Sequence, residues 1–135
     1  HALRALLGDR LELLGRIDQA RLLPRVAAAT VLVAPSLNEF FGNQAVEAIL
    51  LGTPVIATAR TGMSDLIEQI GGGAVVEPEN APAFGAAVAE LLRSGVPATS
   101  DAHIRLRELH SPRAVTDRLL DIYGEVLRDA RKAPA

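Results

Sequence analysis

The 135-residue chain contains no cysteine and no tryptophan, and aromatic residues make up only 3% of it. Without cysteine there is no disulfide framework and no thiolate metal site, so a cytoplasmic protein is the default expectation. The three histidines, His1, His103 and His110, are scattered along the chain without the spacing of metal ligands. The sequence therefore predicts no metal site.

Strong charge and long apolar runs are also lacking. The formal net charge of −2 gives no basic field for nucleic acid or for an acidic membrane surface. No apolar run approaches the ~18–20 residues of a membrane span, and the first residues lack the pattern of a signal peptide. With 49% hydrophobic and 22% charged residues, the composition is that of a globular protein. We expect a single domain with no nucleic-acid partner and no transmembrane segment.

The centre of the sequence, residues 31–58, predicts a β-α-β unit. Residues 31–34 are a short apolar run that ends at Pro35, which is typical of a strand buried on both faces. A helix is expected from Gly42 and Asn43 to residue 51, with apolar side chains on one face, and Gly52 ends it. Residues 55–57 form a second apolar run, which we expect to lie parallel to the first.

The N-terminus of this helix predicts an anion site. It should lie at the carboxyl end of the first strand, where the unpaired backbone N–H groups of residues 41–44 face a crevice. Because no Lys or Arg occurs between Val26 and Ala59, these amides and the helix dipole are the local positive ends. Glu39 and Glu47 frame the site. Carboxylates beside an anion are suited to accept hydrogen bonds from the hydroxyls of an attached sugar or ribose.

These residues carry a resemblance to a known family. The pattern Pro35-Ser36-x-x-Glu39-x-Phe41-Gly42, followed by Glu47-Ala48 and Gly52-Thr53-Pro54-Val55-Ile56-Ala57, resembles the E-x7-E signature region of retaining family 4 glycosyltransferases. A weaker similarity extends from Leu11 to about Tyr123. The resemblance implies an α/β fold, a Rossmann-like doubly wound parallel sheet that is partial here and corresponds to the C-terminal domain of the GT-B fold.

The resemblance also implies a donor and the residues that bind it. The donor is a nucleoside diphosphate sugar, whose hydroxyls are held by Glu39, the implied catalytic residue, and by the backbone amides of Phe41 and Gly42. The amides of Asn43 and Gln44 hold the diphosphate. Glu47 binds the ribose.

Two further segments are implied to touch the donor. The turn that contains Arg16 and Ile17 lies along the nucleotide base, although a solvated turn residue describes Arg16 equally well. The loop after the second strand has Thr61, Gly62 and Asp65 where the family commonly has two glycines and a glutamate, so a backbone contact is kept at Gly62. The implied reaction is retaining and independent of metal, and no cofactor is expected.

The alternative is that the two carboxylates are ordinary solvent-exposed side chains with no part in binding. Glu39 could be a solvated loop acid and Glu47 part of an exposed helix face, because charged residues are mostly exposed. The surrounding pattern favours site positions for both.

Four strands are expected in all, at residues 11–14, 31–34, 55–57 and 74–77, with helices between them. Asp18 is the expected N-cap of a helix over residues 19–29, and Ser64 and Asp65 fall in the first turn of a short helix. A helix over residues 82–93 should turn four apolar side chains inward: Phe84, Val88, Leu91 and Leu92. Residues 94–100 are expected to be a flexible loop.

Two helices should close the chain, one over residues 101–109 and one that begins at Ser111 and Pro112. The second helix has a single apolar stripe, which we expect to pack in the core: Val115, Leu119, Ile122, Tyr123, Val126 and Leu127. Residues 130–135 should fray.

The resemblance aligns the four expected strands with strands three to six of a sheet ordered 3-2-1-4-5-6. Strands one and two of such a domain would then be missing, so the domain is expected to be truncated. Either residues 11–14 pair directly with residues 31–34, or the missing strands belong to a longer chain. We favour the longer chain.

Two functions remain open from the sequence. The first is the donor-binding part of a retaining glycosyltransferase, with the acceptor bound by an absent N-terminal domain. The second is a non-catalytic module that holds a nucleotide or a partner. Glu39 and Glu47 together favour the enzyme, and they argue against a sugar epimerase of the same architecture.

Overall fold

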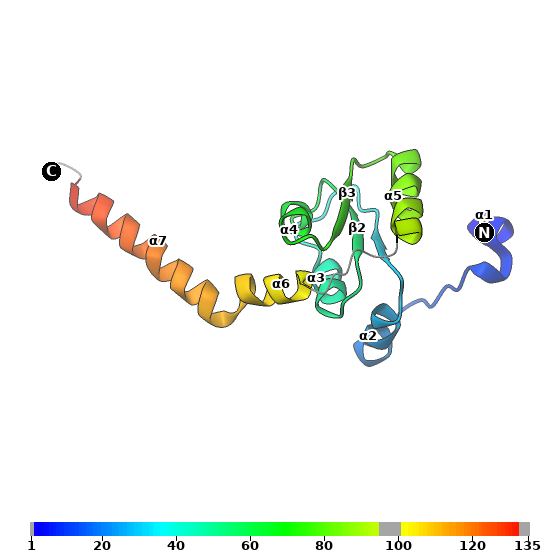
Figure 1. The fold of residues 1–135 in the computed structure, drawn as a ribbon, viewed down its shortest axis with the longest axis horizontal. Helices are drawn as coiled ribbons and strands as arrows, with labels where there is room; N and C mark the ends of the chain where they lie inside the picture. Colours follow the sequence, from blue (N-terminus) through cyan, green and yellow to red (C-terminus); the bar gives the residue numbers. More distant parts are fainter. Residues whose placement is uncertain (1, 95–100, 133–135) are drawn as a thin grey trace.

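The computed structural model describes residues 2–94 and 101–132 and has a three-stranded parallel sheet at its centre (Figure 1). The strands are β1 (Leu32–Ala34), β2 (Val55–Thr58) and β3 (Gly73–Val76), in the order β1-β2-β3. Leu32 is level with Val55, which in turn is level with Gly73. The parallel α/β architecture predicted from the sequence is therefore confirmed.

Helices cover both faces of this sheet. On one face lie α3 (Asn43–Leu50), which joins β1 to β2, and α4 (Ser64–Ile70), which joins β2 to β3. On the other face lies α5 (Ala81–Ser94) (Figure 1). Leu91 of α5 is buried as expected, but Leu92 is 58% exposed, so its predicted inward position is wrong. One step along a helix turns a side chain by ~100°, which carries Leu92 off the buried face.

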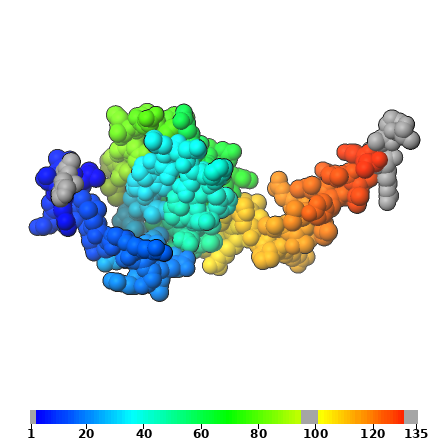
Figure 2. All heavy atoms as spheres, turned by 180° about the vertical axis from the view of Figure 1, so that it is seen from behind, coloured from blue at the N-terminus to red at the C-terminus, as the bar shows by residue number. Residues whose placement is uncertain are grey.

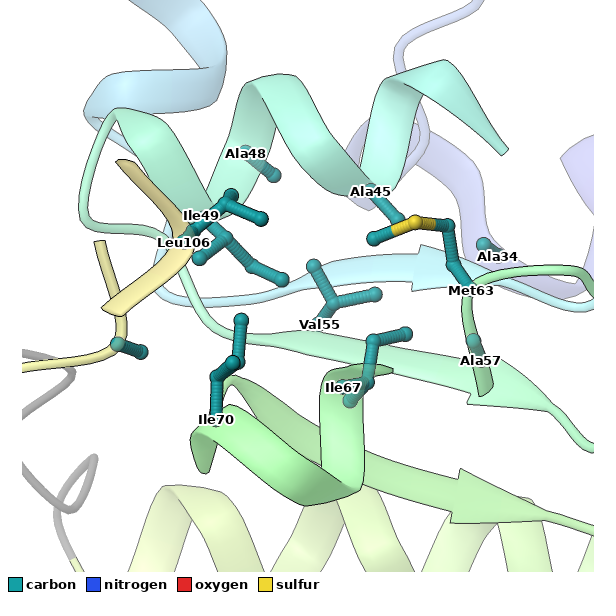
Figure 3. Close-up of a cluster of buried hydrophobic side chains, with 11 residues drawn as sticks. Ala34, Ala45, Ala48, Ile49, Val55, Ala57, Met63, Ile67, Ile70 and Leu106 are labelled. Atoms are coloured by element: carbon teal, nitrogen blue, oxygen red, sulfur yellow. The ribbon is translucent and has the colours of Figure 1, made fainter. Parts of the chain in front are cut away.

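The main hydrophobic core lies between the sheet and the helices α3, α4 and α6 (Ala102–His110) (Figure 3). Ala48 and Ile49 of α3, Val55 of β2 and Ile67 of α4 are all completely buried. The apolar face of α3 expected from the sequence thus provides the contact with the strands. This packing fixes the N-terminus of α3 relative to the carboxyl end of β1.

Helix α2 (Gln19–Ala27) is joined to this core by a polar contact. Its predicted N-cap is confirmed, because the Asp18 carboxylate accepts a hydrogen bond from the Arg21 backbone N–H at 2.9 Å. Near its other end, the Val26 carbonyl accepts a hydrogen bond of 2.7 Å from the hydroxyl of Thr53, a buried residue just before β2. The turn between α3 and β2 therefore holds the end of α2 in place.

The predicted strand over residues 11–14 is wrong. The chain begins with α1 (Ala2–Leu7) and a 3-10 turn (Gly8–Arg10), and residues 11–15 then follow as irregular backbone without a ladder to β1. Leu13 is 65% exposed. A short apolar run becomes a strand only where a neighbouring strand pairs with it, and no described segment does so here. The self-contained four-stranded sheet is therefore not formed.

An ion pair, instead of a ladder, holds this segment to α2. The Arg25 guanidinium donates to both carboxylate oxygens of Glu12, with the shorter contact at 2.8 Å. These hydrogen bonds, together with the positive charge of Arg25, lower the pKa of Glu12, and the same bonds with the negative charge of Glu12 raise the pKa of Arg25. Both side chains are exposed, so the pair is a weak tether.

Two helices follow residues 95–100, which contain most of the predicted flexible loop and lie outside the described residues. Helix α6 (Ala102–His110) places Ala102 and Leu106 in the core, each 2% exposed. Helix α7 (Pro112–Lys132) begins as predicted, since the Ser111 hydroxyl accepts a hydrogen bond from the Ala114 backbone N–H at 3.1 Å. It stays helical through residue 132, and the rest of the segment predicted to fray, residues 133–135, is not described.

The predicted core position of the α7 stripe is wrong. Helix α7 extends away from the sheet, at the opposite end of the molecule from α1 (Figures 1 and 2). The six residues of the stripe are between 43% and 61% exposed: Val115, Leu119, Ile122, Tyr123, Val126 and Leu127. The periodicity reports that one face is apolar but does not report what covers it. No helix among the described residues is long and apolar enough to cross a membrane.

Candidate functional site

The candidate site lies where β1 ends and α3 begins. In open parallel α/β sheets, ligands bind outside the carboxyl ends of the strands, where the loops open into a crevice. Here the connecting loop and the first turn of α3 form an open groove of about 680 Å³. Its lining residues are Ser36, Asn38, Glu39, Phe40, Phe41, Gly42, Asn43 and Gln44. Five of the residues predicted for the site are thereby brought together.

The backbone of Glu39 is fixed by the neighbouring loop. Its N–H donates to the Arg60 carbonyl at 3.1 Å, and its carbonyl accepts from the Gly62 N–H at 3.2 Å. These two bonds form an isolated parallel bridge between Glu39 and Thr61. The loop after β1 and the loop after β2 are therefore joined at the residue that carries the groove's carboxylate.

The side chain of Glu39 is held as well. Its Oε2 atom accepts hydrogen bonds from the Ser36 hydroxyl at 3.1 Å and from the Gln44 side-chain amide at 2.8 Å. No described residue donates a hydrogen bond to its Oε1 atom. The half-buried carboxylate thus has one oxygen engaged by the protein and one available to a ligand.

Two glycines shape the backbone around this carboxylate, for different reasons. Gly42, the N-cap of α3, has a left-handed conformation with φ of 91°, which other residues rarely adopt. Gly62 passes so close to the neighbouring loop that a Cβ atom there would lie 2.1 Å from the Phe40 carbonyl oxygen. Gly62 therefore lets the two loops meet, a role distinct from the predicted donor contact.

The first turn of α3 presents backbone donors to the groove. Ala45 N–H bonds to the Gly42 carbonyl at 2.9 Å. The N–H groups of Asn43 and Gln44 have no such acceptor among the described residues, as expected for the start of a helix. With no Lys or Arg between Val26 and Ala59, these amides and the dipole of α3 are the local attraction for an anion.

Glu47 lies one turn further along α3 and outside the lining of the groove. It is half-buried, and its Oε1 atom accepts a hydrogen bond of 3.1 Å from the Gln19 side-chain amide. Gln19 is the first residue of α2 and follows Arg16 and Ile17 closely in sequence. Neither Arg16 nor Ile17 lines the groove. Arg16 is exposed and Ile17 is half-buried.

Three contributors were not predicted from the sequence: the side chains of Ser36, Gln44 and Gln19. Ser36 belongs to the motif and lies three residues before Glu39, but the motif implies no role for its hydroxyl. For Gln44 the resemblance implies a role of the backbone amide alone. Gln19 is 28 residues from Glu47, and no local pattern reports such a contact. Among the described residues, no group of three or more histidine or acidic side chains could hold a metal ion.

Comparison with known proteins shows the family of the chain. Residues 1–94 match the family described as glycosyl transferases group 1. The chain is 32% identical, over 87% of its length, to a D-inositol 3-phosphate glycosyltransferase of Salinispora tropica. It is 30% identical, over 93% of its length, to the enzyme of the same name from Mycobacteroides abscessus. These alignments cover 27% and 28% of the two relatives, so the chain spans about a quarter of their length.

A solved structure supports the same family. Sucrose-phosphate synthase from Thermosynechococcus elongatus superposes with a TM-score of 0.76 at 30% sequence identity. The match covers 95% of this chain and 33% of that protein. Because the family match spans most of the sequence and the structural match nearly all of it, the chain belongs to the group 1 glycosyl transferases.

Proposed function

We propose that the chain is the donor-binding part of a retaining glycosyltransferase that takes a sugar from a nucleoside diphosphate sugar. The observation that carries this proposal is the Glu39 carboxylate. It stands beside the free amides of a helix N-terminus, with one oxygen held and the other without a partner among the described residues. An anion at the amides and a hydroxyl at the carboxylate together describe a phosphorylated sugar.

Within this proposal each group binds a different part of the donor. The amides of Asn43 and Gln44 receive the diphosphate, and Glu39 with the amides of Phe41 and Gly42 receives the sugar hydroxyls. Through these contacts the protein orients the sugar and stabilises the charge that develops on the diphosphate leaving group, without a metal ion.

The nucleoside is assigned to the surface beside α2. Glu47 accepts hydrogen bonds from the ribose hydroxyls through Oε2, because its Oε1 atom already accepts a hydrogen bond from the Gln19 side chain. The segment of Arg16 and Ile17, just before α2, lies along the base. Gly62 supports the sugar site through the backbone of Phe40. The acceptor is bound by a part of the complete protein that this chain does not include.

Two substitutions in the complete protein test these assignments. Glu47→Ala should weaken binding of both the free nucleotide and the nucleotide sugar, because both contain the ribose. Glu39→Ala should leave the free nucleotide bound but lose activity that depends on the sugar. The loss of a hydrogen bond to a charged group corresponds to ~1.5–3 kcal/mol in each case. Calorimetry with ADP, GDP and UDP and with their glucose conjugates measures the affinities, and release of free nucleotide from the glucose conjugates measures the activity.

A matched control is Glu68→Ala, which removes an exposed carboxylate from α4, away from the groove. It should change neither affinity. If Glu47→Ala leaves nucleotide affinity unchanged, the ribose assignment is wrong. If the complete protein binds nucleotides but never transfers or hydrolyses a sugar, it is instead the non-catalytic module that the sequence left open.

A further inference from the structure

The side chain of Gln44 makes the shortest hydrogen bond to the candidate carboxylate. Its amide donates to Glu39 Oε2 at 2.8 Å, while the Ser36 hydroxyl donates to the same oxygen at 3.1 Å. Both donors are neutral. An arginine in this place would engage both carboxylate oxygens as a fork, but the two neutral donors converge on one and leave Oε1 unused by the described residues.

The two donors come from different elements. Gln44 is the second residue of α3, whose position is fixed by the buried Ala45, Ala48 and Ile49. Ser36 follows β1, and its carbonyl accepts a hydrogen bond from the buried hydroxyl of Thr58 on β2. The carboxylate of Glu39 is thus held between the sheet and the helix, on rigid elements at both sides.

The backbone of Glu39 is fixed independently of its side chain. The hydrogen bonds to the Arg60 carbonyl and from the Gly62 N–H hold the main chain whether or not Gln44 is present. With the main chain fixed, the orientation of the carboxylate depends on the torsions of its own side chain. Gln44 and Ser36 restrict those torsions.

We propose that the Gln44 side chain is a positioning residue, which fixes the Glu39 carboxylate so that Oε1 faces a hydroxyl of the donor sugar. This role is separate from that of the Gln44 backbone amide at the diphosphate. It rests on the proposed function, in which Glu39 binds the sugar. A ligand group that is already oriented avoids the entropy of ordering at the moment of binding.

The test uses Gln44→Met in the complete protein, because methionine keeps the length of the side chain and the backbone N–H but removes the amide donor. Affinity for ADP, GDP and UDP should stay within about twofold of the wild type. The additional affinity given by the sugar, measured with UDP-glucose, GDP-mannose and ADP-glucose, should fall by about three- to tenfold, the typical net contribution of one hydrogen bond, because Gln44 acts on the sugar only through Glu39.

Gln69→Met is the matched control. It makes the same chemical change at an exposed position on α4 whose side chain has no hydrogen bond with another described residue. This variant should behave as the wild type in every assay. If Gln44→Met also behaves as the wild type while the nucleotide sugar still binds, the positioning role is wrong.

A double-mutant cycle separates positioning from general support of the fold. In a Glu39→Ala background, Gln44→Met should have no further effect on sugar-dependent affinity, because the group that it orients is gone. An equal loss in both backgrounds would overturn the inference. If the wild-type protein binds none of the nucleotides or nucleotide sugars, the proposed function itself fails, which is a result distinct from either of these.

Discussion

Gly62 is the residue on which the shape of the site depends most directly. Its backbone conformation is an ordinary one, so the need for glycine comes from space and not from torsion angles. A Cβ atom would lie 2.1 Å from the Phe40 carbonyl oxygen and 3.2 Å from the Phe41 Cα atom. Both neighbours are backbone, which cannot turn aside as a side chain can. Any larger residue must therefore push the two loops apart.

We expect Gly62→Ala to destabilise the complete protein by about 1–3 kcal/mol, as overpacking does, and to weaken nucleotide-sugar binding as well. Gly85→Ala is the matched control, because that glycine lies inside α5 with no atom within 4 Å of its added Cβ. It should stabilise by roughly 0.5–1 kcal/mol. Urea unfolding midpoints compare the two variants, and a neutral Gly62→Ala would contradict the close approach.

At the scale of single residues, sequence spacing predicted correctly which neighbouring residues lie together in the groove. Five residues predicted for the site come from one stretch of sequence and line one groove: Glu39, Phe41, Gly42, Asn43 and Gln44. Contacts between distant segments were not predicted, because sequence spacing carries no information about them. The Gln19 amide reaches Glu47 and the Thr53 hydroxyl reaches Val26 only after α2 packs beside α3.

At the scale of elements, α3 couples the core to the groove. One face of this helix is buried against the strands, and its first turn provides the amides and Gln44. Ile49 is completely buried among core residues (Figure 3). A change in the core can therefore reach the site through the position of one helix.

Ile49→Ala should destabilise the complete protein by about 2–5 kcal/mol, the usual cost of emptying a buried isoleucine site. Ile104→Ala makes the same change at a residue of α6 that is 48% exposed, and it should cost less than ~1 kcal/mol. Thermal unfolding measured under one set of conditions orders the two variants. Equal losses would mean that the core does not lie where α3 meets the sheet.

The elements predicted correctly are those whose partners lie within the described residues. The apolar runs that became β1, β2 and β3 pair with one another, and the caps at Asp18 and Ser111 are set by adjacent residues. The apolar run at residues 11–14 and the stripe of α7 have equally clear patterns. They fail as predictions because a pattern states that a surface is apolar, whereas its partner decides whether it is buried.

At the scale of the whole molecule, the chain holds one side of the proposed reaction. It spans about a quarter of the length of its curated relatives, 27% in the alignment with the Salinispora tropica enzyme. The groove presents backbone amides, and the sequence around it contains no Lys or Arg between Val26 and Ala59. Backbone amides alone bind a diphosphate weakly, because each hydrogen bond contributes little net free energy in water.

We therefore expect the isolated 135-residue chain to show no sugar transfer, under conditions in which the complete protein is active. The reason is that the acceptor site, and any basic side chains that bind the diphosphate, are proposed to lie in a part of the complete protein outside this chain. Incubation with UDP-glucose, GDP-mannose or ADP-glucose, followed by detection of released nucleotide, measures this directly. A transfer rate from the purified 135-residue chain would refute the assignment.

The bridge between Glu39 and Thr61 joins the loop after β1 to the loop after β2. The backbone N–H and the carbonyl of Glu39 are both hydrogen-bonded to the second loop. Gly62 of that loop lies in close contact with the backbone of Phe40. Phe41 and Gly62 also border a second hollow of about 540 Å³, between α4 and the junction of α6 and α7. If a movement of α7 reaches this hollow, we expect the two joined loops to move together, so that the hydrogen bonds of the Glu39 backbone are kept.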